Sequence, residues 1–211
     1  MAHDDDIYAT GFGRTQVSAD EAMHRLVEGN ARFLAGQERF AGMQRDALAA
    51  LALEQRPYAT VLGCSDSRVA PELIFDAVLG ELFVVRVAGN VLSPEVAGSL
   101  QYAGAHLQTP LFVVLGHGGC GAVKAALERR FRGVQHHSRI HLLLESILPA
   151  LHDIDTRLDP AAQLAQAVEA NVRWTLRQIQ ESPEGRARLA EGRLQVVGAI
   201  YDLESGQVRF L

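Results

Sequence analysis

The chain contains few cysteines, and this low number restricts the possible classes of protein more than any other absence. Its 211 residues contain only two cysteines, Cys64 and Cys120, whereas a disulfide framework needs more. No apolar run approaches the roughly 18 to 20 residues that span a bilayer. Three of the first six residues are aspartates, where a signal peptide would be basic. We therefore expect a cytoplasmic protein that does not cross a membrane.

The chain also lacks an excess of either charge. Its 20 Lys and Arg residues against 25 Asp and Glu give a net charge of −5. So mild a balance indicates neither nucleic acid nor a membrane surface as partner. We find no internal repeat, linker or low-complexity segment, and the length suits one domain with a full core. We expect a single domain over residues 1–211, with residues 1–17 as an N-terminal arm.

Apolar strands alternate with amphipathic helices along the sequence. Helices are predicted from a capping box at 18–21 onward and at about 43–54, 71–78, 93–107, 119–131, 137–151 and 160–180. Strands are predicted at 58–63, 82–87, 111–116, 194–201 and 207–211. This order predicts an α/β fold. Its central sheet is mostly parallel, with about four strands plus an antiparallel edge strand, and helices cover both faces.

Three potential metal ligands directly follow two of these strands. Cys64 comes after strand 58–63, and His117 and Cys120 come after strand 111–116. Ligands of parallel sheets bind at the carboxyl ends of the strands, so these side chains should meet. Two thiolates and an imidazole suit Zn²⁺ and leave one coordination position for water or substrate, as in catalytic sites. We expect metal-assisted hydration or hydrolysis. A redox pair of the two cysteines is the alternative.

Asp66 and Arg68 lie beside the first cysteine and allow two arrangements. Asp66 can act as a fourth zinc ligand, which closes the site. Alternatively, Arg68 holds Asp66 in a charge-assisted pair, and the carboxylate is then free to orient the attacking group. Arg68 should lower the pKa of Asp66. An Asx turn with a surface salt bridge is the purely structural interpretation.

Three segments together resemble the β-class carbonic anhydrases in order and spacing. They are Cys64-Ser65-Asp66-Ser67-Arg68, Phe83-Val84-Val85-Arg86 and His117-Gly118-Gly119-Cys120-Gly121, and the resemblance covers about residues 20–205. It implies zinc on the two cysteines and the histidine, an Asp66–Arg68 catalytic dyad, and reversible hydration of CO₂ to bicarbonate and a proton. It also implies a homodimer or homotetramer in which N-terminal helices wrap the partner.

The resemblance is to the plant-like, open-site subgroup, and it implies a set of substrate-binding residues. Polar contacts to substrate would come from Gln55, reaching across a dimer interface, and from the backbone N–H of Gly121. A small apolar pocket would be lined by Val69, Phe83, Ala88 and Tyr102. CO₂ carries neither net charge nor dipole, so a dry niche with few polar groups suits it.

A second subgroup stores bicarbonate in an inhibitory pocket built on Trp, Arg and Tyr. Arg86 and Tyr201 match two of these positions, but Val61 stands at the Trp position. We therefore expect no such pocket, and expect Arg86 to pair with a carboxylate. Two other functions remain open. One is hydrolysis of carbonyl sulfide or carbon disulfide on the same site, and the other is a structural zinc module for protein association.

Overall fold

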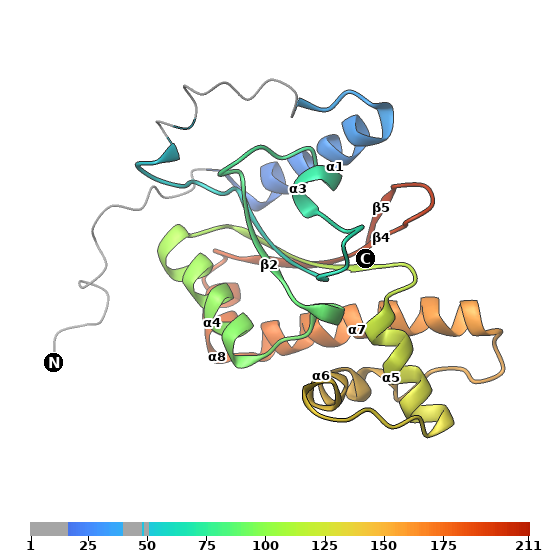
Figure 1. Cartoon of the computed structure of the whole chain (residues 1–211). Helices are drawn as coiled ribbons and strands as arrows, with labels where there is room; N and C mark the ends of the chain where they lie inside the picture. The colour runs from blue at the N-terminus through green and yellow to red at the C-terminus, as the bar shows by residue number, and fades with distance from the viewer. Residues whose placement is uncertain (1–16, 40–47, 49–50) are drawn as a thin grey trace, which may run out of the picture.

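A five-stranded sheet forms the centre of the computed structural model, which describes residues 17–39, 48 and 51–211. The spatial order is β2-β1-β3-β4-β5 (Figure 1). The strands are β1 (Ala59–Gly63), β2 (Leu82–Arg86), β3 (Leu111–His117), β4 (Gln195–Tyr201) and β5 (Val208–Phe210). The first four are parallel, and β5 pairs with β4 in the antiparallel sense. The predicted sheet is confirmed.

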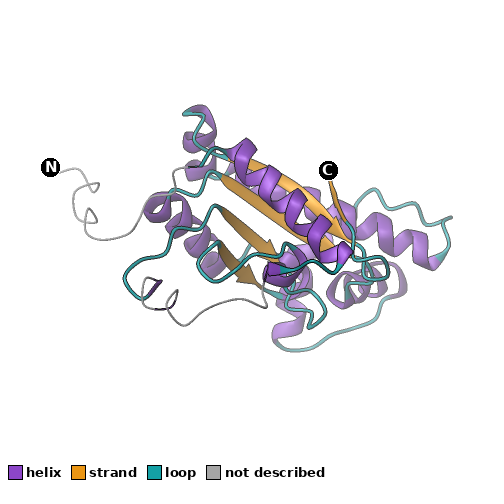
Figure 2. Ribbon diagram, turned by 90° about the horizontal axis from the view of Figure 1, so that it is seen from above, coloured by secondary structure: helices purple, strands orange, loops and turns teal. Residues whose placement is uncertain are grey.

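Helices cover both faces of this sheet, as predicted. In Figure 1, α1 and α3 lie on one side and the remaining labelled helices lie on the other; Figure 2 shows the strands with helices in front of and behind them. The first side has α1 (Ala19–Ala35) and α3 (Pro71–Ile74). The second has α4 (Pro94–Tyr102), α5 (Gly121–Arg132), α6 (Arg139–Ile147), α7 (Pro160–Glu181) and α8 (Pro183–Ala190).

The alternation of side chains along each strand explains why both faces are apolar. Val61 of β1 and Val113 of β3 pack with the cluster under α1, whereas their neighbours Leu62 and Val114 pack with the cluster under α4 and α7. Successive residues of a strand point to opposite faces, so a strand buried on both sides must be apolar throughout. All residues of β1 and β3 are buried. The two strands that precede the predicted metal ligands are thus the most enclosed in the sheet.

Several boundaries differ from the predictions. The helix expected at 93–107 is α4 followed by a π-helical turn, Ala103–Leu107, which ends at Gln108 in the left-handed region. The helix expected at 137–151 is α6 followed by a 3₁₀ turn, Leu148–Leu151. Helix α8 was not predicted, because only Gly185 within it is buried and the apolar periodicity is weak. The arm at 1–17 and the helix at 43–54 lie mostly outside the described residues.

A buried carboxylate anchors the chain after α1 to the rest of the domain. The side chain of Asp76 is 0% exposed and accepts hydrogen bonds from the Arg32 side chain and from the backbone and side chain of Arg39. Burial by itself raises the pKa of Asp76, but the hydrogen bonds from the two arginines outweigh it and hold the pKa below its usual value. Among the described residues, no helix has the length and apolar character needed to cross a membrane.

Candidate metal centre

The structure brings the three predicted ligands together at the carboxyl ends of β1 and β3. Possible ligand atoms of Cys64, His117 and Cys120 all lie within 4.8 Å of one another, and all three residues are buried. The parallel register places Gly63 opposite Leu115, so Cys64 directly follows the last residue of β1. His117 is the last residue of β3, where it pairs with Tyr201 of β4. Cys120 follows in the loop that leads into α5.

The imidazole of His117 is oriented as a metal ligand. Its Nδ1 lies 2.9 Å from the carbonyl oxygen of Gly118, which can only accept a hydrogen bond, so Nδ1 carries the proton. Nε2 therefore presents its lone pair. This atom is buried and has no hydrogen-bond partner among the described residues. Ligating histidines typically donate their other N–H to a carbonyl in this way. The donor set thus fits a metal ion such as zinc.

The two thiols share one proton when no metal is bound. A hydrogen bond from the Cys120 thiol is the main cause that lowers the pKa of Cys64 to about 4. Contacts with His117 and with the backbone N–H of Gly89 lower it further, against the effect of burial. The pKa of Cys120 is raised because its proton is held against the Cys64 thiolate and because it is buried. The Cys64 thiolate is therefore ready to bind a cation.

Asp66 lies next to this group and is held by Arg68. The Asp66 carboxylate accepts three hydrogen bonds from Arg68: from the backbone N at 3.0 Å, from Nε at 2.9 Å and from Nη2 at 2.8 Å. The arginine hydrogen bond is the main reason that the pKa of Asp66 lies well below its usual range. Asp66 Oδ2 is 4.0 Å from His117 Nε2, so the carboxylate faces the ligand atom.

The loop that carries Cys64 and Asp66 is tied to the end of β2. Arg86 donates from Nε to the Cys64 carbonyl oxygen at 3.0 Å and from Nη2 to the Asp66 carbonyl oxygen at 2.7 Å. Both contacts are with backbone oxygens of the same chain, and the expected pairing of Arg86 with a carboxylate that supports the dimer stays a prediction. The guanidinium group of Arg86 thus bridges two carbonyl groups of one tight loop through two different donor atoms.

The predicted substrate-binding residues lie on both faces of the sheet. The rings of Phe83 and Tyr102 lie 6.1 Å apart between centroids. Val69 is fully buried in the cluster under α1, whereas Phe83 packs against the cluster on the opposite face. Gln55 is half-buried. Ala88 begins the turn that contains Gly89, whose N–H contacts Cys64, and Gly121 directly follows Cys120.

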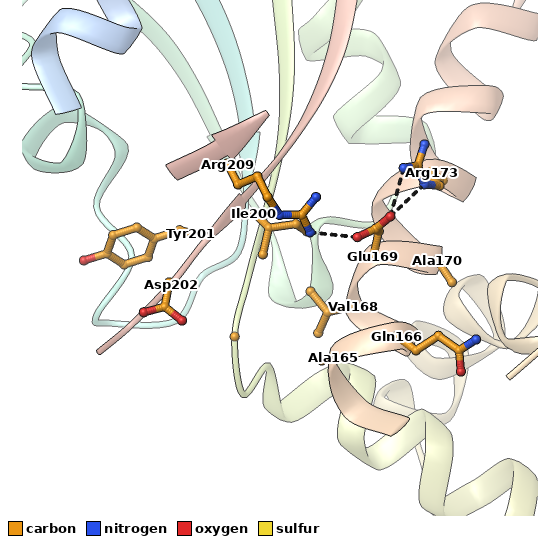
Figure 3. A pocket seen from close by; sticks show the side chains of 11 residues that line it. Ala165, Gln166, Val168, Glu169, Ala170, Arg173, Ile200, Tyr201, Asp202 and Arg209 are labelled. Atoms are coloured by element: carbon orange, nitrogen blue, oxygen red, sulfur yellow. Dashed lines mark hydrogen bonds and ion pairs between the residues drawn. The ribbon is translucent and has the colours of Figure 1, made fainter. Parts of the chain in front are cut away.

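A separate cleft of about 530 Å³ lies behind the loop after β3 (Figure 3). It includes Gly118 but none of the three ligand residues. Its polar feature is Glu169, which bridges Arg173 at 2.8 Å and Arg209 at 2.8 Å. The acidic and basic side chains of the cleft neutralise one another, so it has no evident preference for a charged ligand.

Sequence reasoning missed the contribution of Gly89. Its backbone N–H donates to Cys64 Sγ at 3.3 Å, and its carbonyl accepts from Asn171 of α7. The Ala88-Gly89-Asn90 segment directly after a predicted strand was the available signal, since glycine there suggests a special backbone conformation. Nothing in the local pattern pointed to Asn171, which lies 82 residues further on.

Comparison with known proteins identifies the family. A family model described as carbonic anhydrase matches residues 59–208. The chain is 39% identical to carbonic anhydrase 2 of Mycobacterium tuberculosis over 187 residues, which cover 88% of this chain and 89% of that protein. The solved β-carbonic anhydrase CcaA is 29% identical with a TM-score of 0.70, over 89% of this chain and 94% of that one. The chain belongs to the β-class carbonic anhydrases.

A more distant β-carbonic anhydrase supports the fold alone. A tetrameric enzyme from Sordaria macrospora is 24% identical, with a TM-score of 0.74 over 90% of this chain and 97% of that one. As a carbonic anhydrase, the protein catalyses the hydration of CO₂. The family consists of metalloenzymes, and the Cys64, His117 and Cys120 group is a site where the chain can bind a metal.

Proposed function

We propose that this carbonic anhydrase hydrates CO₂ reversibly to bicarbonate and a proton with one Zn²⁺ held by Cys64, His117 and Cys120. The observation that carries the proposal is the buried Nε2 of His117, which has no partner among the described residues and lies within 4.8 Å of two cysteine sulfurs. Leaving such an atom unpaired in a core is unfavourable, and a metal ion satisfies it. When bound, zinc supplies Lewis-acid activation of water near neutral pH.

In this proposal, Asp66 orients the attacking group and Arg68 keeps Asp66 in place. The low pKa of Asp66 keeps it ionised at neutral pH, so it accepts a hydrogen bond and does not store the proton. The proton therefore passes to solvent and buffer. The bidentate contact between Asp66 and Arg68 supports the open arrangement over Asp66 as a fourth ligand.

The substrate is held mainly by shape. We assign the apolar part of the niche to Val69, Phe83, Ala88 and Tyr102, and the polar contacts to Gln55 and the N–H of Gly121. In support, Phe83 and Tyr102 lie side by side. Gly121 is the first residue of α5, where a backbone N–H lacks a partner within the helix.

We further propose that the enzyme is a cytoplasmic homodimer or homotetramer. In support, β2 is an edge strand whose apolar residues 82–85 are only half-buried in the single chain. Edge strands of this kind are usually covered. The Sordaria macrospora relatives are tetrameric. In such an assembly Gln55 would reach substrate from a neighbouring chain, which agrees with its half-buried position.

The test combines metal analysis with stopped-flow hydration of CO₂. We expect one zinc per chain in the parent and loss of most zinc and activity in Cys120→Ser. The control is Ala126→Ser, which places a hydroxyl at a fully buried position of α5, the helix that follows Cys120. Retention of zinc by Cys120→Ser with normal affinity would refute the ligand assignment. Zinc without hydration would indicate a structural module, and faster turnover of carbonyl sulfide than of CO₂ would move the function to that substrate.

A further inference from the structure

The turn Ala88–Asn90 contacts a proposed zinc ligand through its backbone. The N–H of Gly89 donates to Cys64 Sγ at 3.3 Å. Gly89 has a φ of 67°, in the left-handed region that favours glycine. A Cβ at this position would lie 2.9 Å from Ile147 Cδ1 and 3.2 Å from Ala122 Cβ. The side chains of Ile147 and Ala122 thus pack closely against the backbone at Gly89.

Two side chains of helix α7 donate hydrogen bonds to the same turn. Asn171 donates from Nδ2 to the Gly89 carbonyl oxygen at 2.8 Å, and Thr175 donates from Oγ1 to the Asn90 carbonyl oxygen at 3.3 Å. Residues four apart on a helix share a face, so the two side chains contact successive carbonyl groups of the turn. Each is only 1% exposed.

The chemistry of Asn171 indicates that this contact is its role. A carbonyl oxygen can only accept, so the amide must present its donor, Nδ2, to Gly89. Its other polar atom, Oδ1, is buried without a hydrogen-bond partner among the described residues. Such burial is unfavourable, and the neighbouring buried residues Val168 and Val172 are apolar. Packing alone would be served better by an apolar side chain here.

We propose that Asn171 is a positioning residue for the metal centre. By holding the Gly89 carbonyl group it fixes the backbone of Gly89, so that the N–H on the other side of the Gly89 Cα points at Cys64 Sγ. The inference rests on the proposed zinc site and deepens it. A hydrogen bond to a ligating thiolate holds the sulfur in place and withdraws charge from it. Groups that orient a metal ligand typically change metal affinity by about 10- to 100-fold.

The test compares Asn171→Leu with Asn30→Leu. Asn30 is a matched control, because it is also a buried helical asparagine that bonds backbone groups, those of Ile74, Gly206 and Val208. Zinc affinity is measured by competition with a chromophoric chelator, and the cobalt-substituted proteins give the thiolate-to-cobalt charge-transfer band. For Asn171→Leu we expect about 10-fold or greater loss of zinc affinity and a band shifted to longer wavelength. Asn30→Leu should lose stability and show neither change.

Two further measurements keep the inference open to refutation if Asn171→Leu does not fold. Asn171→Ala removes the same donor with a smaller side chain. In the unmutated chain substituted with cadmium-113, scalar coupling between the metal and the Gly89 amide proton reports the N–H to sulfur bond directly. Absence of that coupling, or unchanged zinc affinity and cobalt spectrum in a folded Asn171 variant, would overturn the role of Asn171. A parent chain that binds no zinc, or whose cobalt-substituted form shows no thiolate-to-cobalt band, would instead refute the zinc site itself.

Discussion

Replacing Asp66 by Asn should abolish most hydration with little effect on folding. The Asp66–Arg68 pair makes three hydrogen bonds, but Arg68 is 58% exposed, so solvent screens the pair and its loss should lower stability only slightly. We expect a fall in Tm of no more than a few degrees. An orienting carboxylate typically contributes about 10² to 10⁴ in rate. The expected rise in the activation barrier, about 3 to 5 kcal/mol, is thus much larger than the loss of stability.

The chain contains a matched control for this variant. Asp155 accepts the same three hydrogen bonds from Arg157, at 2.9, 2.9 and 2.8 Å, but does not belong to the metal centre. Asp66→Asn and Asp155→Asn are compared by stopped-flow CO₂ hydration, zinc content and thermal unfolding at one protein concentration. We expect similar small changes in Tm, and a 100-fold or larger rate loss only in Asp66→Asn. Equal rates in the two variants, or retention of activity by Asp66→Asn, would refute the proposed role.

Three further outcomes follow from the structure. Asp76→Asn should lower the free energy of unfolding by about 2 to 3 kcal/mol at pH 7. This is less than the loss expected on breaking a fully buried ion pair, because the two arginine partners of Asp76 are partly exposed. Since the folded state lowers the pKa of Asp76, this difference should shrink in urea titrations as the pH falls below about 4, and a constant difference would contradict it. Gly116→Ala should destabilise the fold by about 1 to 3 kcal/mol, because its Cβ would lie 2.5 Å from Val172 Cγ2. Gly98→Ala should instead stabilise helix α4, because nothing lies within 4 Å of its added Cβ. Equal shifts in Tm for Gly116→Ala and Gly98→Ala would count against this reasoning. Added bicarbonate should inhibit hyperbolically, because Val61 supplies no donor for a second anion site; steep, cooperative inhibition would show that one exists.

The grouping of the three candidate metal ligands could be predicted from the sequence, because these residues follow simple local signals. Cys64 and His117 each stand at the end of an apolar strand, and parallel strands bring such ends to one edge. The same reasoning correctly gave the antiparallel β5, since a short turn joins it to β4. These inferences need only hydrophobic patterns and the positions of a few reactive side chains.

The groups that support the ligands could not be predicted in this way. Arg86 and Asn171 act on backbone carbonyls, and the positions of these carbonyls depend on the folded loop. A contact between a side chain and a distant peptide group leaves no pattern in one sequence. A local pattern can also occur where it has no role in the site. Asp66–Arg68 and Asp155–Arg157 have nearly identical geometries, but only the first pair lies beside the candidate metal ligands.

The separation of the ligands along the chain has a consequence for biosynthesis. Cys64 and His117 are 53 residues apart, and each is placed by a strand that is already paired in the sheet. A metal ion cannot gather them in the unfolded chain as it does in a zinc finger, where the ligands are close in sequence. Under the proposed zinc assignment, a chain made without the metal should therefore fold as apoprotein. Such apoprotein should gain activity when zinc is added, without refolding.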